Sequence, residues 1–348
     1  MQVVIDRIRR GLSDRFKSTV ISTSAGSSTI TSSEDGELIT VRSMGEIKSL
    51  PISPGLAPVL LKKARKSDLL VVHYPFPLAD AAIALVRFRL PPVIIYWHSE
   101  IVSQKYARWL VKPMTHLMLL RCKAIIVSSP KMIEHSKLLK QHRGKCHIIP
   151  FGYEPQRSVE ISDDGYFLCI GRHVHYKGIE VLIRSLIYCD AYIRIIGTGP
   201  LLAFHRVLAD KLGVAKRVQF ITDADDREVL LQMSRCKALV LPSIMPSEAF
   251  GLVQLEAMSL GKPVINTYLP SGVPWVARNM KEGLTVNPGD EKSLAWALTK
   301  LLNDKELLKK LGNSARLRWE DKFTMKKFCD ETAKLYGELL RAKSSPNR

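Results

Sequence analysis

Two glutamates, Glu248 and Glu256, are separated by seven residues and flank Gly251. The pattern predicts a strand that ends at Pro242, a loop that carries Glu248, and a helix that begins near Gly251. The open amides of a helix start at the carboxyl edge of a parallel sheet are a usual place for a phosphate. Glu248 would then lie beside the phosphate, and Glu256 would reach the two hydroxyls of a ribose. The spacing alone is equally compatible with two solvated helix glutamates.

A second cluster lies in residues 171–178, with the sequence Gly-Arg-His-Val-His-Tyr-Lys-Gly, directly after a predicted strand. Its two cations, Arg172 and Lys177, are five residues apart on a loop that glycines bracket. Such a pair can hold both phosphates of a diphosphate, and arginine supplies a bidentate contact. Solvated surface charges are the alternative, and the bracketing glycines favour the phosphate clamp. A third loop, residues 197–200, lacks the spacing of a dinucleotide fingerprint and could be a simple turn.

Histidines and aspartates at predicted strand ends give weaker candidates. His98 follows a strand, and a single histidine in that place is more often a structural hydrogen-bonding group than a catalytic one. His73, His173 and His175 are expected to be supporting contacts at most. Residues 223–226 (Asp-Ala-Asp-Asp) are similar to a metal-binding DxD, but they precede a predicted helix, where aspartates are good caps. We therefore predict no metal.

The elements that must position these residues alternate along the whole chain. Short apolar runs rich in β-branched residues recur between helical stretches. The predicted strands are residues 69–73, 93–97, 124–128 and 147–150 in the first half, and 166–171, 192–197, 218–222, 238–242 and 263–266 in the second. This rhythm predicts an α/β protein with two parallel sheets covered by helices.

The length of 348 residues fits two Rossmann-like domains. We expect an N-terminal acceptor-binding domain at residues 1–152 and a C-terminal nucleotide-sugar-binding domain at residues 153–318. A C-terminal helix at residues 319–348 is expected to cross back to the first domain. The polar residues 152–165 are the predicted linker.

The beginning of the chain departs from this scheme. Residues 2–15 are predicted to form a helix with Val4, Ile5, Ile8 and Leu12 on one face, whereas a doubly wound domain opens with a buried strand and a Gly-rich turn. The first strand is therefore expected to be missing. Residues 22–33, nearly all Ser, Thr and Gly, are interpreted either as a low-complexity linker or as a long surface loop.

The composition restricts the class of protein and its partners. With 46% hydrophobic and 24% charged residues the chain is expected to be globular, and its six isolated cysteines indicate a reducing, cytosolic setting. The formal net charge is +19, and residues 1–160 hold 24 Lys and Arg against 12 Asp and Glu. That excess suggests nucleic acid or an anionic membrane face as partner. No RRM, KH or helix-turn-helix pattern supports nucleic acid.

Membrane contact would be peripheral, because no run of 18 apolar residues is present. The predicted surface is residues 105–123, in which basic and apolar side chains interleave, and an ordinary helix with a solvated basic face is the open alternative. The basic residues are Lys105, Arg108, Lys112, Arg121 and Lys123, and the apolar ones are Trp109, Leu110, Val111, Met118 and Leu119.

Together these segments resemble the retaining glycosyltransferases of family 4, which have the GT-B fold. The resemblance extends from residue 67 to the C-terminal helix and is greatest over residues 166–290. It rests on the combination of Glu248 and Glu256 with Gly171-Arg172 and Lys177-Gly178. It implies two Rossmann-like domains that face a central cleft, with the first strand of the N-terminal domain missing here, and a nucleotide-sugar donor as substrate.

The resemblance also implies the role of each site residue. Arg172 and Lys177 would hold the donor diphosphate, Glu256 the ribose, and Glu248 the transferred sugar. The implied catalytic residues are His98, beside the donor sugar, together with Glu248, Arg172 and Lys177. The implied donor-binding residues are Arg172, Lys177, Gly199, Glu248, Ala249, Phe250, Gly251, Leu252 and Glu256. No side chain stands out as a nucleophile, so a same-face displacement is favoured over a covalent intermediate.

Residues 149–152 and 270–275 are similar to bacterial mannosyltransferases that build O-antigen or exopolysaccharide repeats on a polyprenyl diphosphate lipid. GDP-mannose is the first expected donor and a UDP-hexose the second, with no cofactor. The acceptor would be a polyprenyl-diphosphate-linked oligosaccharide at the inner face of the cytoplasmic membrane. Family members carry a first strand and a Gly-Gly loop before the helix that begins here at Gln2. A truncated, inactive fragment that binds only membrane or protein partners is therefore the alternative, and a nucleic-acid binder is the third option.

Overall fold

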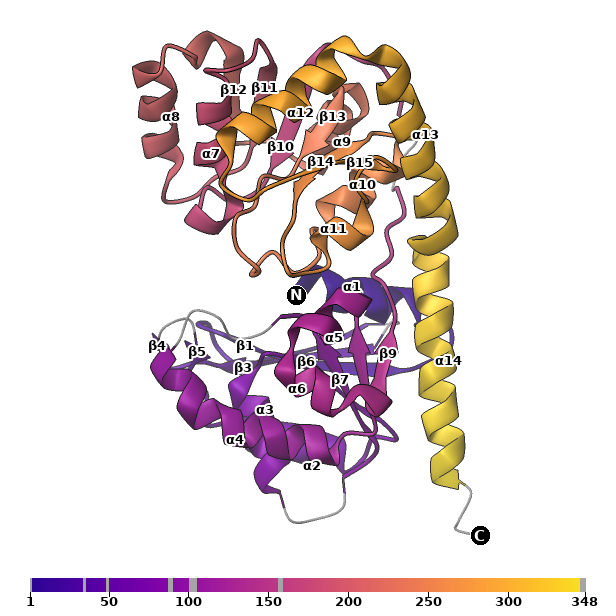
Figure 1. Cartoon of the computed structure of the whole chain (residues 1–348). Coiled ribbons are helices and arrows are strands. Elements are labelled where there is room, and N and C mark those ends of the chain that lie inside the picture. Colours follow the sequence, from indigo (N-terminus) through magenta and orange to yellow (C-terminus); the bar gives the residue numbers. More distant parts are fainter. Residues whose placement is uncertain are drawn as a thin grey trace. The chain divides into compact units, whose positions relative to one another are not determined.

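The computed structural model describes residues 2–33, 36–47, 50–86, 90–99, 105–155 and 159–344. The chain divides into two compact units (Figure 1). Unit 1 consists of Met1–Pro150 and Met325–Arg348, and unit 2 consists of Phe151–Thr324. The chain thus leaves unit 1 after Pro150 and returns to it at Met325.

Unit 2 is built on a six-stranded parallel sheet in the order β12-β11-β10-β13-β14-β15. Its strands are β10 (Tyr166–Ile170), β11 (Tyr192–Ile196), β12 (Val218–Ile221), β13 (Ala238–Val240), β14 (Val264–Thr267) and β15 (Gly283–Val286). The chain begins in the middle at β10, runs to one edge at β12, and then crosses to β13 on the other side of β10. The strand order therefore reverses between β10 and β13, and ligands of open α/β sheets bind beyond the carboxyl ends of the strands at such a point.

Helices flank this sheet, and the strands bury their apolar residues beneath them. The helices of unit 2 are η2 (His175–Lys177), α7 (Ile179–Ser185), α8 (Leu202–Lys211), η3 (Ala215–Arg217), α9 (Asp226–Arg235), α10 (Val253–Ser259), α11 (Val273–Val276), α12 (Glu291–Asn303) and α13 (Lys305–Lys322). Phe167 of β10 and Val240 of β13 are fully buried in one core with Leu182 of α7 and Leu298 of α12. A parallel strand that is covered on both faces needs such continuous apolar sequence.

The described residues of unit 1 form three separate sheets. A parallel sheet has the order β6-β7-β8-β9, with β6 (Leu70–Tyr74), β7 (Val93–Trp97), β8 (Ala124–Val127) and β9 (Cys146–Ile148). A second sheet has the order β1-β3-β2, with β1 (Ser18–Ser24), β2 (Thr29–Ser33) and β3 (Gly36–Arg42), where β3 is parallel to β1 and antiparallel to β2. A short antiparallel pair joins β4 (Glu46–Ile47) to β5 (Leu50–Pro51).

The helices of unit 1 include the two ends of the described chain. They are α1 (Gln2–Gly11), α2 (Leu56–Ala64), α3 (Pro77–Leu85), α4 (Lys105–Arg121), α5 (Pro130–His135), α6 (Lys137–Gln141), η1 (Arg143–Lys145) and α14 (Met325–Ser344). The predicted opening helix is confirmed, and Val4, Ile8 and Leu12 are buried. It packs against α14, where Arg15, just beyond α1, lies 2.8 Å from Asp330 and the hydroxyl of Tyr96 in β7 lies 3.1 Å from that of Thr332.

Three expectations about local structure are wrong. Residues 22–33 are neither a linker nor a loop, because β1 and β2 pair with β3, and the exposure of all of β2 explains its polar composition. The predicted final helix is two helices, since α13 ends at Lys322 and α14 begins at Met325. The helix breaks where the backbone oxygen of Phe323 accepts a hydrogen bond from the amide of Tyr153, at 2.9 Å.

The third wrong expectation is that all of residues 105–123 form a surface for the membrane. Met118 and Leu119 are fully buried in the core of unit 1 and are not available to a lipid. The guanidinium of Arg121 donates to the backbone oxygens of Ile83 and Val86, at 2.9 and 2.5 Å, and so holds the end of α3. The side chains of residues 105–112 lie outside the described part of the chain, so the rest of this surface stays a prediction.

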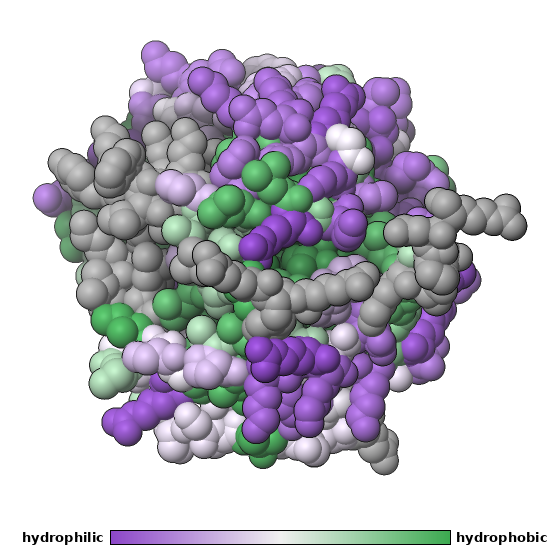
Figure 2. Space-filling view, turned by 90° about the horizontal axis from the view of Figure 1, so that it is seen from below, coloured by the Kyte–Doolittle hydropathy of each residue, from purple (hydrophilic) through white to green (hydrophobic). Residues whose placement is uncertain are grey.

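Two further observations bear on membranes. Among the described residues, no helix has both the length and the apolar composition that crossing a bilayer requires. On the face of the molecule seen in Figure 2, hydrophobic side chains form small patches beside hydrophilic ones.

Candidate active site

The three predicted donor-binding segments of unit 2 all follow the carboxyl ends of parallel strands. Residues 171–178 follow β10, residues 197–200 follow β11, and residues 241–252 follow β13. Backbone hydrogen bonds join them: the amide of His173 donates to the oxygen of Thr198 at 2.8 Å, and the amide of Ile244 donates to the oxygen of Tyr176 at 2.9 Å. The structure therefore brings these segments together at the edge where the strand order reverses.

Lys177 and Glu248 form an ion pair at this edge. Nζ of Lys177 lies 2.6 Å from Oε2 of Glu248, and their side chains are 17% and 11% exposed. The same carboxylate oxygen accepts a hydrogen bond from the hydroxyl of Ser243 at 3.1 Å. Burial acts to lower the pKa of Lys177, but the charge and hydrogen bond of Glu248 outweigh it and raise that pKa. The ammonium is therefore held charged, and it is aimed by a carboxylate from a loop 71 positions later in the sequence.

Gly178 explains how Lys177 can lie so close to the loop after β13. Its φ of 66° lies in the left-handed region, and a Cβ there would overlap the backbone oxygen of Pro242. Any other residue would push the two loops apart. Glycine is thus required at residue 178, directly after Lys177, because its backbone packs against the backbone of Pro242.

The loop before α10 is anchored by the side chain of Phe250. This ring is buried and forms edge-to-face contacts with Phe151 and Phe323, at centroid distances of 5.2 and 6.2 Å. The side chain of Phe250 is therefore structural, which leaves its backbone and that of Gly251 and Leu252 as the groups that a ligand could contact. Glu256 follows on α10 and is partly buried.

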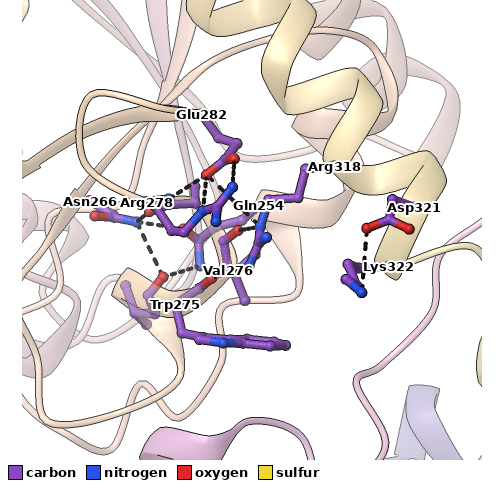
Figure 3. A network of polar contacts seen from close by, with 11 residues as sticks. Gln254, Asn266, Trp275, Val276, Arg278, Glu282, Arg318, Asp321 and Lys322 are labelled. Atoms are coloured by element: carbon purple, nitrogen blue, oxygen red, sulfur yellow. Dashed lines mark hydrogen bonds and ion pairs between the residues drawn. The ribbon is translucent and has the colours of Figure 1, made fainter.

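Asn266 and Gln254, two polar residues that the sequence did not single out, hold this loop through buried hydrogen bonds (Figure 3). The side-chain amide of Asn266 in β14 donates to Oε1 of Gln254 at 2.9 Å and to the backbone oxygens of Val273 and Ala277 at 3.2 and 2.9 Å. Gln254 in turn donates to the backbone oxygen of Phe250 at 2.8 Å. A polar side chain inside a buried strand or on a buried helix face has to be hydrogen-bonded, and that signal would have found both residues.

A second layer of the same network holds α11. Arg318 of α13 donates to the backbone oxygens of Val276 and Trp275 at 2.9 and 2.8 Å. Arg278 binds the buried carboxylate of Glu282 with its Nε and its Nη2, at 3.0 and 2.5 Å (Figure 3). Residues 270–275, which carry part of the resemblance, are thereby fixed next to the loop before α10.

Comparison with known proteins agrees with this arrangement. The family model described as glycosyl transferases group 1 matches residues 153–318, and the model for glycosyltransferase family 4 matches residues 1–157. The chain is 30% identical over 322 residues to O-antigen chain mannosyltransferase C of Escherichia coli, which covers 89% of this chain and 86% of that protein. It is also 30% identical over 274 residues to D-rhamnosyltransferase WbpZ of Pseudomonas aeruginosa, covering 75% and 71% of the two chains.

The chain belongs to glycosyltransferase family 4. Solved structures show that this glycosyltransferase has the GT-B fold with two Rossmann-like domains, as predicted. Sucrose-phosphate synthase from Thermosynechococcus elongatus superimposes with a TM-score of 0.78 at 20% identity, covering 98% of this chain and 93% of that one. Anabaena HepE, solved with UDP and glucose, gives 0.78 at 17% identity, covering 97% and 95%.

The remaining predicted catalytic residue of the glycosyltransferase, His98, lies in unit 1, whereas the donor-binding segments lie in unit 2. Its Nε2 is 2.9 Å from Nδ1 of His73, and we call these two residues the histidine pair of unit 1. Tyr96 stacks on His73 at a centroid distance of 5.0 Å. Burial lowers the pKa of His73 to about 3 and that of His98 to about 4. Both rings are therefore neutral at physiological pH.

Of the three aspartates after β12, Asp225 is a helix cap, as expected. Asp225 precedes α9, and its carboxylate accepts a hydrogen bond from the amide of Glu228 at 2.7 Å. Within the described ranges, no three His, Cys, Asp or Glu side chains come close enough to hold a metal ion. Donor binding without a metal stays a prediction for this glycosyltransferase.

Proposed function

We propose that this glycosyltransferase transfers mannose from GDP-mannose to a polyprenyl-diphosphate-linked glycan in O-antigen or exopolysaccharide assembly, with retention of the anomeric configuration and without a metal. The named function of the Escherichia coli relative, an O-antigen chain mannosyltransferase, supports the choice of sugar. A UDP-hexose is the second candidate donor, because the structural neighbour HepE was solved with UDP and glucose.

The observation that carries the proposal is the buried ion pair of Lys177 with Glu248. A lysine that is fixed in its charged form, on the same loop as exposed Arg172 and at the carboxyl edge of a doubly wound sheet, suits a diphosphate. Both contacts of Glu248 use Oε2, so we assign its Oε1 to a hydroxyl of the transferred sugar. Glu256 on α10 is assigned to the ribose.

The proposed reaction exchanges one bond at the anomeric carbon for another on the same face. The bond from C1 to the donor phosphate oxygen breaks, and a bond from C1 to the acceptor oxygen forms. The proton of the acceptor hydroxyl passes to the departing phosphate oxygen. Arg172, Lys177 and the backbone amides near Gly251 would stabilise the charge that grows on that phosphate, and groups fixed before the reaction need no reorganisation to do so.

His98 is the proposed contact to the donor sugar in unit 1. Its low pKa keeps the imidazole neutral at pH 7, so that the ring takes part through hydrogen bonds and adds no positive charge. Removing the ring with His98→Ala is therefore expected to lower kcat.

Calorimetry with GDP and with UDP in EDTA tests the donor site. Arg172→Ala should weaken binding by about 1.5 to 3 kcal/mol through the loss of a charge-assisted hydrogen bond. Arg184→Ala is the matched control, because Arg184 lies on α7 of the same unit and pairs with Glu180 at the surface. Equal affinity of wild type and Arg172→Ala would remove the clamp from the proposal.

Turnover is tested with GDP-mannose and UDP-hexoses on a synthetic polyprenyl diphosphate glycan, and proton NMR of the product gives the anomeric configuration. Mannosyl transfer in EDTA with retention is expected. Product formed only from a UDP-hexose would transfer the proposal to the second donor. An inverted product would refute the same-face reaction.

Vesicle sedimentation tests the proposed peripheral contact with the membrane. The protein should bind anionic vesicles more than neutral ones, since each basic contact near such a surface is worth about 1 kcal/mol. Changing Lys105, Arg108 and Lys112 to Glu should reverse the preference, whereas the same change at Lys309 and Lys310 of unit 2 should not. Equal sedimentation of the two charge-reversed variants would exclude α4 as the contact.

A further inference from the structure

A buried pair of histidines joins the loop at residues 171–178 to α8 in unit 2. Nδ1 of His173, in the loop after β10, is 2.8 Å from Nδ1 of His205, on α8. His173 is 0% and His205 is 1% exposed. Neither residue has a role in the chemistry described above, although His173 is the direct neighbour of Arg172.

Packing alone does not account for this pair. Two Nδ1 atoms at this distance share one hydrogen, so one ring has to donate and the other to accept. Burial lowers the pKa of both rings, that of His205 to about 4, so both are neutral. Nε2 of His173 is buried and has no hydrogen-bond partner among the described residues, which makes the ring costly to bury. An apolar pair would fill the same space without this cost.

The hydrogen bond between the rings completes a set of contacts that fix residue 173. Its amide donates to the backbone oxygen of Thr198 at 2.8 Å, and its own backbone oxygen accepts from the amide of Leu201 at 3.0 Å. Between them lies Gly199, where a Cβ would approach the backbone nitrogen and oxygen of His173 to 2.7 Å. The backbone at residue 173 is thus held by the loop after β11, and its side chain is held by α8.

We propose that His205 is a positioning residue: through its hydrogen bond to His173 it fixes the backbone that carries Arg172, and so places the guanidinium for the donor diphosphate. The inference rests on the proposed function of Arg172. His205 itself touches no substrate, because its ring is enclosed in the core. A loop held at both its backbone and its side chain keeps a charged group in place at a low entropic cost on binding.

The decisive comparison is His205→Leu with His205→Asn. The two replacements are nearly equal in size, but Asn places a polar atom where histidine carries Nδ1, whereas Leu has none there. In calorimetry with GDP, His205→Leu should raise Kd about tenfold, the usual effect of one lost hydrogen bond. His205→Asn should restore most of the affinity. Val207→Leu is the matched control, since Val207 is exposed to solvent on the same helix, and it should leave Kd unchanged.

A double-mutant cycle separates positioning from general loss of structure. If His205 acts through Arg172, then His205→Leu should add little to the loss already caused by Arg172→Ala, because coupled residues are not additive. The same tenfold loss in both backgrounds would overturn the inference. So would a Kd for His205→Leu equal to that of the wild type, or an Asn variant no better than Leu.

If His205→Leu does not fold, the comparison of Asn with Gln decides: Gln carries its polar atom at the Nε2 position, so it should bind GDP more weakly than Asn, and equal affinities would refute the inference. If the wild type binds neither GDP nor UDP, the proposed function itself fails. Wild-type binding with unaffected His205 variants would refute only the positioning role.

Discussion

Replacing Lys177 by methionine should destabilise unit 2 far more than removing a surface charge. The substitution keeps most of the aliphatic stem and removes the ammonium that faces Glu248 at 2.6 Å. It leaves a carboxylate that is 11% exposed, with Ser243 as its remaining hydrogen-bond donor. The free energy of unfolding should fall because the charge of Glu248 would be buried without its counter-ion.

The size of the effect follows from the burial of the pair. Removing one partner of a buried ion pair costs about 3 to 5 kcal/mol, and the remaining exposure places this pair at the lower end, about 3 kcal/mol. For a unit of this size each kcal/mol lowers the unfolding midpoint by about 2 to 4 °C, so a fall of about 6 to 12 °C is expected. Lys300→Met is the matched control, since Lys300 and Asp304 are 44% and 36% exposed at 3.0 Å, and its midpoint should move by less than about 2 °C.

Differential scanning calorimetry at pH 7 without nucleotide measures both variants. The double variant Lys177→Met with Glu248→Gln should regain much of the loss, because its neutral amide no longer leaves a charge without a partner. Equal midpoints for Lys177→Met and Lys300→Met would refute the reasoning. A double variant less stable than Lys177→Met alone would show that packing, and not the unpaired charge, sets the cost.

Three further outcomes are expected. Glu256→Ala should raise the Kd for GDP, whereas Glu248→Ala should mainly lower kcat. The ribose is bound in every state of the reaction, but the transferred sugar develops charge only in the transition state. An equal rise of Kd in both variants would mean that these roles are misassigned. Urea unfolding should show that unit 1 loses stability as the pH falls from 7 toward 4. The histidine pair of unit 1 has a lower pKa in the folded protein than the value near 6.5 in the unfolded chain, so the unfolded chain binds protons first. Changing both histidines to Leu should flatten the dependence of stability on pH, and an unchanged dependence would exclude them as its origin. Gly178→Ala should lower the free energy of unfolding by at least about 2 kcal/mol, from its left-handed backbone and the overlap with Pro242. Gly213→Ala, with φ of 69° and open space around it, should lower it by about 1 kcal/mol, and equal losses by calorimetry would argue against the overlap.

Local sequence determined most of the strands of the two parallel sheets. β7 and β11 were predictable because continuous β-branched runs bounded by turn residues favour buried parallel strands, and this signal lies within a few residues. β1 and β2 were not, because their Ser- and Thr-rich sequences are those of a loop, and only pairing with β3 makes them strands. The positions of Met118 and Leu119 were misjudged for a related reason: the apolar face of a helix can meet either the protein core or a lipid surface, and the helix sequence does not distinguish the two.

The site divides in the same way. Arg172, Lys177, Glu248 and Glu256 could be selected as candidates from residue type, short spacing and the family resemblance, since a glycine-bracketed loop after a strand is a local feature. Their partners were not: Ser243 for Glu248, Asn266 for Gln254, and His205 for His173.

The physical reason is that hydrogen bonding within a turn or helix depends on neighbours in sequence, whereas the partner of a buried charge depends on strand order. Lys177 meets Glu248 because the loops after β10 and β13 are adjacent, and they are adjacent because β13 pairs with β10 in parallel after the chain has passed through β11 and β12. The sequence determined which groups could bind a phosphate. The tertiary structure decided which of them hold one another in place.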